Sequence, residues 1–237
     1  SDAIVTKEQL MQLKNLIREL QPNCLVNSRL GLSMEEDSDI DFKTLGDNQL
    51  GDQKADFPWQ SPATVSHSWG YHRTDTEWKS ISTLLQSLIG NVSLNGNFML
   101  NIGPRADGTM PHEMKQRLLE IGQWLNVNGE SVYGASAFDL PKDQHDWGRI
   151  TKKKMSDGGT RLYLHLFNWP YNEKLNVTGV TFQPEKIYML SDKQENGLEY
   201  EHNGAITTVQ LPELKTNPYV PVVVVEYEGY PGIKQGL

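Results

Sequence analysis

The sequence predicts an α/β region followed by an all-β region. Up to about residue 135, apolar runs of strand length alternate with segments whose apolar residues recur at helical spacing. Beyond Tyr133, short runs rich in Val, Ile, Thr, Tyr and Leu are separated by turns that contain glycine. The 237 residues are 37% hydrophobic and 22% charged, which is typical of a folded chain with one large domain or two smaller ones.

The elements of the α/β region follow from local signals. Thr6 and Gln9 have the spacing of a capping box, and Pro22 blocks continuation, so a helix is predicted up to Leu20. A strand is predicted at 24–27, followed by an irregular acidic stretch. Two more strands are predicted at 63–66 and 98–102, with helices at 75–94 and from Pro111 toward residue 129.

Strands that alternate with helices indicate a parallel sheet covered by helices, either open and doubly wound or part of an eight-stranded barrel. A complete barrel needs eight strands, whereas the first 135 residues offer three candidates. We therefore expect that further strands of this domain precede Ser1 in the natural protein.

The all-β region is predicted as an antiparallel β-sandwich. Alternation places Leu162, Leu164 and Leu166 on a core face, and Tyr163 and His165 on a half-exposed face. The predicted domains are 1–138 and 139–237, because both periodicities are interrupted near 135–142. The candidate strands are 149–154, 160–169, 174–178, 186–190, 205–211 and 221–227, with turns at 157–159, 195–197 and 203–204.

Charge and composition exclude several partners. The formal net charge of −8 disfavours the broad basic surface that nucleic acids require, and the longest apolar run, 222–225, is far too short for a membrane span. Cys24 is the single cysteine, and His67 and His72 have no third ligand at a recognisable spacing. We expect no metal and no cofactor.

Functional residues of a barrel lie at the carboxyl ends of its strands. Arg29 follows the first predicted strand, where it could hold a sugar or carboxylate, or form a surface ion pair. Between residues 59 and 72, aromatic and imidazole groups cluster, and they could stack on a polar ring such as a sugar or pack in a core. This cluster contains Trp59, His67, Trp69, Tyr71 and His72.

Several motifs, taken in their order along the chain, resemble those of the α-L-fucosidases of glycoside hydrolase family 29. The resemblance is strong over residues 1–135 and extends to the β-rich tail. The motifs are Asn27-Ser-Arg29, Phe57-Pro-Trp59-Gln60-Ser-Pro62, Ser68-Trp69-Gly-Tyr71, Trp78-Lys-Ser80, Asn97-Phe-Met-Leu-Asn101-Ile-Gly-Pro104 and Asn128-Gly-Glu130-Ser-Val-Tyr133-Gly134.

The resemblance implies that residues 1–138 are the C-terminal part of a catalytic (β/α)8-like barrel and that 139–237 are the β-sandwich that follows it. It also implies a retaining exo-glycosidase that removes terminal α-L-fucose, with an aspartate nucleophile and a glutamate acid/base about 5 Å apart. The nucleophile is expected upstream of Ser1, and Asp2 is not expected to replace it. Gln60 stands where many members carry the acid/base glutamate. Arg29 is implied to contact the sugar, and Trp59, His67 and Trp69 are implied to form pocket walls.

Three explanations of Gln60 stay open: an engineered substitution, a natural loss of activity, or a natural variant in which another carboxylate is the acid, which we favour. The candidates, unranked by sequence, are Glu35, Glu36, Asp37, Asp39, Asp41, Asp47 and Asp52.

The competing functions are a fucose-binding protein that has lost its acid and, from the tail alone, a module for protein contacts. Fucosylated glycans as substrates imply a periplasmic, extracellular or lysosomal location. The sequence does not predict the oligomeric state.

Overall fold

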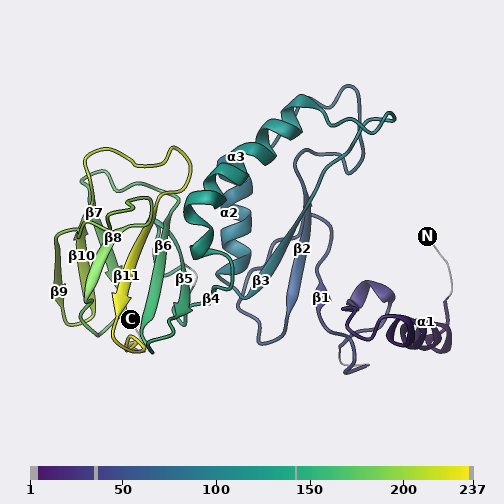
Figure 1. The fold of residues 1–237 in the computed structure, drawn as a ribbon, viewed down its shortest axis with the longest axis horizontal. Coiled ribbons are helices and arrows are strands. Elements are labelled where there is room, and N and C mark those ends of the chain that lie inside the picture. The colour runs from purple at the N-terminus through teal and green to yellow at the C-terminus, as the bar shows by residue number, and fades with distance from the viewer. Residues whose placement is uncertain (1–4, 35–36, 142, 235–237) are drawn as a thin grey trace.

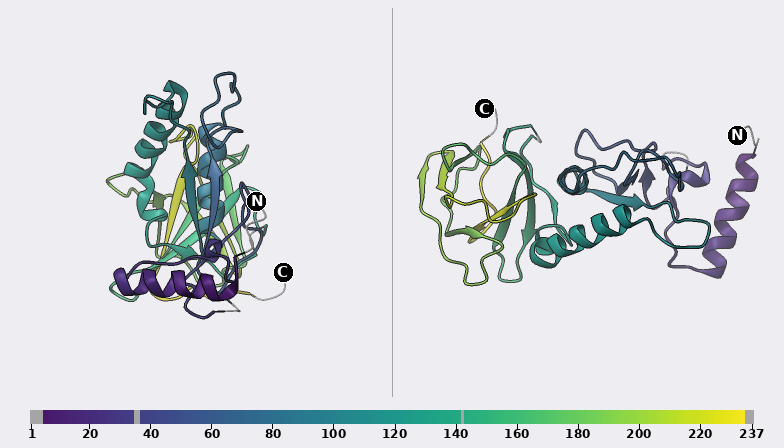
Figure 2. Two further views of the ribbon diagram at one scale, coloured as in Figure 1. Left: turned by 90° about the vertical axis from the view of Figure 1, so that its right-hand side faces the viewer. Right: turned by 90° about the horizontal axis from the view of Figure 1, so that it is seen from above.

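The computed structural model describes residues 5–34, 37–141 and 143–234. Its α-helices are α1 (Lys7–Leu20), α2 (Ile81–Val92) and α3 (His112–Asn128). Figure 1 shows α2 and α3 between a small parallel sheet and a larger all-β part, with α1 at the far end of an elongated molecule. The view from above in Figure 2 shows the same separation of α1 from the all-β part.

Helix α1 begins and ends where the sequence predicts. The Thr6 side chain accepts from the Gln9 N–H and the Gln9 side chain accepts from the Thr6 N–H, which is the predicted capping box. The helix nevertheless buries little apolar surface, because Leu13 and Leu16 are about half exposed, 48% and 49% respectively. Its only fully buried residue is Lys14.

The parallel sheet consists of β1 (Lys43–Thr44), β2 (Trp59–Thr64) and β3 (Gly96–Asn101), in that order. The predicted strand at 24–27 is wrong in extent, because only Asn27 forms a bridge, to Phe42. The prediction also missed β1 and started β2 four residues late because of Pro62. The Pro62 carbonyl accepts from the Asn48 N–H at 2.8 Å on the side where β1 has already ended, so the missing proline N–H costs no ladder bond.

Helix α2 begins later than predicted, at Ile81 rather than Asp75. Strand β3 begins two residues earlier than predicted, at Gly96 rather than Phe98. The Ser80 Oγ accepts from the Thr83 N–H at 3.0 Å and caps α2. Asp75, the predicted start, instead accepts from the backbone of Glu77 and Ser68 in a loop. Helix α3 follows Pro111 as predicted.

Two antiparallel sheets form the all-β part. The larger sheet has the order β4 (Ser136–Ala137), β5 (Gly148–Lys154), β6 (Thr160–Leu166), β11 (Val222–Tyr227) and β8 (Lys186–Met189). The smaller has the order β7 (Lys174–Thr178), β10 (Ile206–Gln210) and β9 (Tyr200–Asn203). Side chains of both sheets, such as Leu164 and Val177, share one core, which is the packing of a β-sandwich. Strand β9 was not predicted.

The prediction that the second face of the larger sheet is half exposed is wrong. Tyr163 and His165 were expected to be half exposed, but both are fully buried. They lie under α2 and α3, where Tyr163 shares an apolar cluster with Leu85 and Trp124. The Trp124 indole N–H also donates to the Val220 carbonyl at 2.7 Å. The helices therefore cover the parallel sheet on one side and the sandwich on the other.

Among the described residues, none of the helices combines the length and the apolar composition that crossing a bilayer requires.

Candidate active site

The segments that follow the parallel strands meet at one edge of the sheet, because parallel strands point their carboxyl ends the same way. Within the sheet, Leu100 and Ile102 pack with Leu84 on the side of α2. By alternation Asn97 faces the other side, and Gln60, which is opposite Asn97 in register, shares that face. We call this the inner face, the side of the sheet away from α2.

Arg29 and Asp47 form an ion pair at this edge. The Arg29 Nη2 lies 2.6 Å from the Asp47 Oδ1 and donates to the Leu45 carbonyl at 2.8 Å. Their side chains are 51% and 56% exposed. Asn27 holds Arg29 in place, because its Oδ1 accepts from the Arg29 N–H at 2.9 Å. A cation and a carboxylate are thus presented together, accessible to a ligand.

Asn48 was not singled out from the sequence, yet it anchors the segment that carries Asp47. Its Oδ1 accepts from the Thr64 N–H at 3.2 Å and from the Lys79 Nζ at 3.0 Å. Its backbone has φ 56°, a conformation that asparagine tolerates better than most residues. The run Gly46-Asp47-Asn48 was the available signal, since it is a turn sequence. Burial lowers the pKa of Lys79.

Trp69 lies in the loop after β2, half-buried, and its carbonyl accepts from the Asn101 Nδ2 at 2.7 Å. The loops after β2 and β3 touch backbone to backbone: a Cβ on Gly103 would come within 2.5 Å of the Gly70 carbonyl carbon. Only glycine fits there. A hydrogen bond from Ser66 contributes most to lowering the pKa of Asp75, which orders the same loop. Trp69 is therefore held beside the end of β3.

Gln60 lies within the sheet rather than in a loop beyond it. Its Nε2 donates to the Thr44 Oγ1 at 3.2 Å, and the Thr44 N–H donates to the Ser28 Oγ at 3.0 Å. This chain of contacts links Gln60 to the residue before Arg29. The side chain of Gln60 thus belongs to the inner face, with its amide engaged by a neighbouring strand.

Trp59 and His67 lie on the side of the sheet toward α2. Trp59 is 2% exposed, and its ring fills the space between Gly51 and Gly96. It has no exposed face on which a sugar could stack, so in this structure it packs rather than lines a pocket. His67 is exposed, with its Nε2 3.0 Å from the Glu77 carboxylate. It borders a cavity of about 350 Å³ with Lys79, Leu84 and Phe98 among the lining residues.

Comparison with known proteins places this arrangement in a family. The family model described as Alpha-L-fucosidase matches residues 2–130, which include every candidate site residue named so far. The chain belongs to the α-L-fucosidase family.

An α-L-fucosidase of Dictyostelium discoideum is 39% identical over 208 residues, 85% of this chain and 44% of that protein. The chain thus spans less than half the length of this curated relative. The structure of an α-L-fucosidase from Vibrio sp. strain EJY3 matches with TM-score 0.83 and 29% identity over 96% of this chain and 40% of its own. α-L-Fucosidase isoenzyme 1 of Paenibacillus thiaminolyticus matches with TM-score 0.83 and 27% identity, over 95% and 55%. Both structural matches include the sandwich.

The acidic stretch of the chain separates into carboxylates that bind α1 and carboxylates that do not. Asp37 and Asp39 both contact the buried Lys14, the latter at 3.1 Å. Asp41 accepts from the Val26 N–H at 2.6 Å and from Arg18 at 2.8 Å. Bonding to Lys14 lowers the pKa of Asp37, and the Val26 N–H followed by Arg18 lowers that of Asp41. These three groups fasten α1 to the loop.

The remaining candidates are placed differently. Glu35 and Glu36, like Asp2, lie outside the described residues. Asp52 is exposed and precedes β2, away from the carboxyl ends of the strands. Asp47 alone among the described candidates lies beside Arg29. Within the described ranges 5–34, 37–141 and 143–234, no three His, Cys, Asp or Glu side chains gather as metal ligands.

Proposed function

We propose that the protein containing this chain hydrolyses terminal α-L-fucose from fucosylated glycans with retention of configuration. The observation that carries the proposal is the exposed Arg29–Asp47 pair at the strand ends of an α-L-fucosidase family chain. The planar guanidinium of Arg29 suits sugar hydroxyls. The nucleophilic aspartate is expected from outside residues 1–237.

The parallel sheet is proposed to be part of an eight-stranded barrel. The bridge from Asn27 to Phe42, then β1, β2 and β3, are parallel neighbours in the order in which they occur in the chain. A barrel has this sequential order, whereas a doubly wound sheet reverses direction at a switch point. The exposed inner-face residue Met99, at 46%, would be covered by the closed barrel. The division into 1–138 and 139–237 remains part of the proposal.

Asp47 is proposed as the acid/base carboxylate. It is a carboxylate beyond the end of a strand, whereas the Gln60 amide cannot supply an acidic proton. When the sugar takes over the hydrogen bonds of Arg29, Asp47 is released from its ion pair. A retaining enzyme needs one protonated carboxyl group about 5 Å from the nucleophile. Asp47 could donate this proton to the leaving oxygen.

The test uses the full-length protein with 4-nitrophenyl α-L-fucoside, a natural fucoside, and the variants Asp47→Asn and Gln60→Glu. That leaving group needs little acid assistance. We expect Asp47→Asn to lose hydrolysis of the natural fucoside by about 100-fold or more, and azide to restore turnover of the aryl fucoside, because azide attacks without a general base.

An Asp47→Asn protein with normal activity on natural fucosides would refute the assignment of Asp47. A gain in Gln60→Glu would then return the acid/base role to position 60. Fucose binding without turnover of either substrate would favour the alternative function, a fucose-binding protein. A glycan substrate also leads us to propose a periplasmic, extracellular or lysosomal location.

A further inference from the structure

The sandwich carries a groove that is far along the chain from the candidate active site. Gly148 pairs with Leu166, so the segment before β5 and the loop from β6 to β7 lie at the same end of the sandwich. The groove between them has a volume of about 570 Å³, within the range of about 300–1,000 Å³ for small-molecule sites. The outward side chains of Asn176 and Thr178 on β7 form one wall.

The groove has a fixed base. Strand β7 is the edge strand of the smaller sheet, and side chains of the segment 143–147 satisfy its backbone. The His145 Nε2 accepts from the Thr178 N–H at 2.9 Å, and the Trp147 Nε1 donates to the Asn176 carbonyl at 2.9 Å. Burial lowers the pKa of His145 to about 4, which keeps the ring neutral and able to accept.

An aromatic platform stands at the rim. Tyr171 is fully exposed, while Trp169, two residues earlier, packs partly against the sandwich core. Pro170 between them restricts the backbone, so the loop presents the tyrosine on a fixed support. A solvent-exposed ring on an anchored loop is a surface on which the C–H face of a sugar can stack.

The polar groups around the platform select the ligand. Asp143, Asp146 and Asn176 line the groove. Asp143 also pairs with Arg149 and Asn176 accepts from the Thr208 hydroxyl at 2.9 Å, but a carboxylate or amide oxygen can accept more than one hydrogen bond. Lys174 also lines the groove and Arg149 pairs with Asp143, so opposite charges offset one another and the lining does not favour a charged ligand. A neutral ring with an apolar face and many hydroxyl donors satisfies both the platform and the acceptors.

We propose that this groove binds a neutral oligosaccharide, separately from the candidate active site. The choice of a glycan rests on the proposed function, because a fucosidase meets its substrate at the end of longer neutral glycans.

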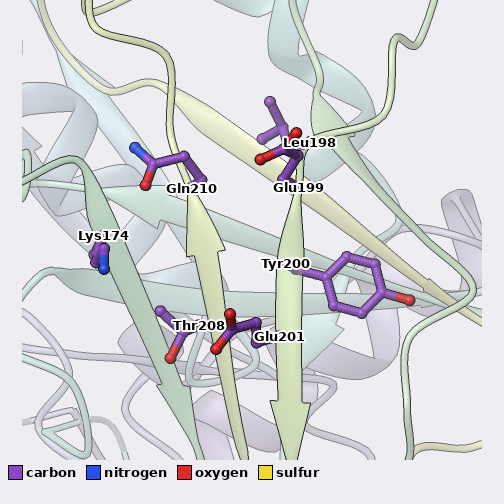
Figure 3. A pocket seen from close by; sticks show the side chains of 7 residues that line it. All are labelled: Lys174, Leu198, Glu199, Tyr200, Glu201, Thr208 and Gln210. Atoms are coloured by element: carbon purple, nitrogen blue, oxygen red, sulfur yellow. The ribbon is translucent and has the colours of Figure 1, made fainter.

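The neighbouring hollow, which shares Lys174, is less suited to a sugar. It has a volume of about 530 Å³ over β7, β9 and β10 and is lined by Glu199, Glu201, Thr208 and Gln210 among others. Figure 3 shows the Tyr200 ring directed away from β10, and its hydroxyl donates to the Pro184 carbonyl at 2.6 Å. Tyr200 is half-buried and held at its hydroxyl, so this hollow offers no fully exposed ring like that of Tyr171, and the sugar is placed on the Tyr171 side.

The test titrates the full-length protein with lactose, N-acetyllactosamine and chitotetraose, which lack fucose and so are not substrates. We expect millimolar or tighter binding by calorimetry, weakened at least about tenfold in Tyr171→Ala, as expected for loss of one stacked ring. Tyr171→Phe keeps the ring and should bind as the parent does. Tyr133→Ala, which removes another exposed tyrosine, is the matched control.

No binding of any of the three sugars, or binding that Tyr171→Ala and Asn176→Ala both leave unchanged, would overturn the proposal. Hydrolysis of 4-nitrophenyl α-L-fucoside is measured on the same samples and should be the same in Tyr171→Ala and the parent. An inactive protein that still binds through Tyr171 would contradict the proposed function and leave the sugar groove standing.

Discussion

The two ends of the molecule use apolar residues differently. In the sandwich and the helices beside it, side chains such as Leu85 and Tyr163 are completely buried in large shared clusters. At the N-terminal end, the cluster around Val26, Leu32 and Ile40 is small, and polar contacts such as those of Lys14 hold α1 in place. Helical periodicity is equally clear in α1 and α2, so the difference comes from what each helix packs against.

The largest expected effect tests this difference in burial directly. Leu85→Ala removes a fully buried side chain and should lower the free energy of unfolding by about 2–5 kcal/mol. Leu13→Ala, at a half-exposed position of α1, should change it by less than about 0.5 kcal/mol. Urea unfolding of both variants measures the two values. An equally large loss in Leu13→Ala of the full-length protein would mean that α1 is buried there too.

The buried histidine of the sandwich should make stability depend on pH. Burial lowers the pKa of His165 to about 3, and its Nδ1 has no hydrogen-bond partner among the described residues. The unfolded chain therefore binds this proton below pH 6.5 while the folded chain does not. The contribution of His165 to the free energy of unfolding is therefore fully present above pH 6.5, and this contribution falls by about 2 kcal/mol on going to pH 5.

Urea midpoints at pH 7.5 and pH 5 check this dependence in the parent and in His165→Gln. The variant should lose about half of the pH-dependent difference, because the buried His145, whose pKa is lowered to about 4, contributes a similar share. Ile150→Val is the control, because it removes a buried methyl group of the same sandwich without a titrating group. The same pH dependence in His165→Gln as in the parent would assign it to other residues.

Asn48 and Asn95 both have positive φ, and comparing their variants distinguishes an effect on the candidate site from an effect on stability alone. Asn48→Gly keeps the backbone conformation but loses the bonds to Thr64 and Lys79, and should lower kcat/KM for a fucoside about tenfold. Asn95→Gly loses the bond from the Ala137 N–H at 2.7 Å, beside the sandwich. It should reduce stability and leave kcat/KM unchanged. Equal kinetic losses in both variants would contradict a local role of Asn48.

The smallest expected effect concerns the exposed pair of His67 and Glu77. Its side chains are 71% and 77% exposed, so solvent screens the interaction. Glu77→Gln should change the free energy of unfolding by less than about 0.5 kcal/mol, measured by urea unfolding. A larger loss would show that the cavity beside His67 is closed in the full-length protein.

Much of the fold was predictable because it depends on neighbours in sequence. The capping box at Thr6, the periodicity of α3 and the alternation of β6 are local patterns, and each element appears at or near its predicted place. Prediction from local sequence failed at Pro62, because proline indicated that no strand would continue through this position, whereas β2 does. The short length of the adjacent strand, which makes the proline harmless, is not a local property.

The candidate site was predictable as a set of residue types but not as an arrangement. Trp59 and Gln60 are adjacent in sequence, and the pleat of β2 sends them to opposite faces of the sheet. Seven acidic residues looked equivalent in sequence, and only their contacts separate Asp47 from those that fasten α1.

By itself, the sequence determined the change from alternating helices and strands to an antiparallel all-β region, the sandwich core face and the resemblance to α-L-fucosidases. The tertiary structure decided that Tyr163 and His165 are buried, that Arg29 meets Asp47, and that Trp59 packs in the interior. The physical reason is distance along the chain. Periodicity reports which face of an element is apolar, but burial and ion pairing depend on groups that only folding brings within contact.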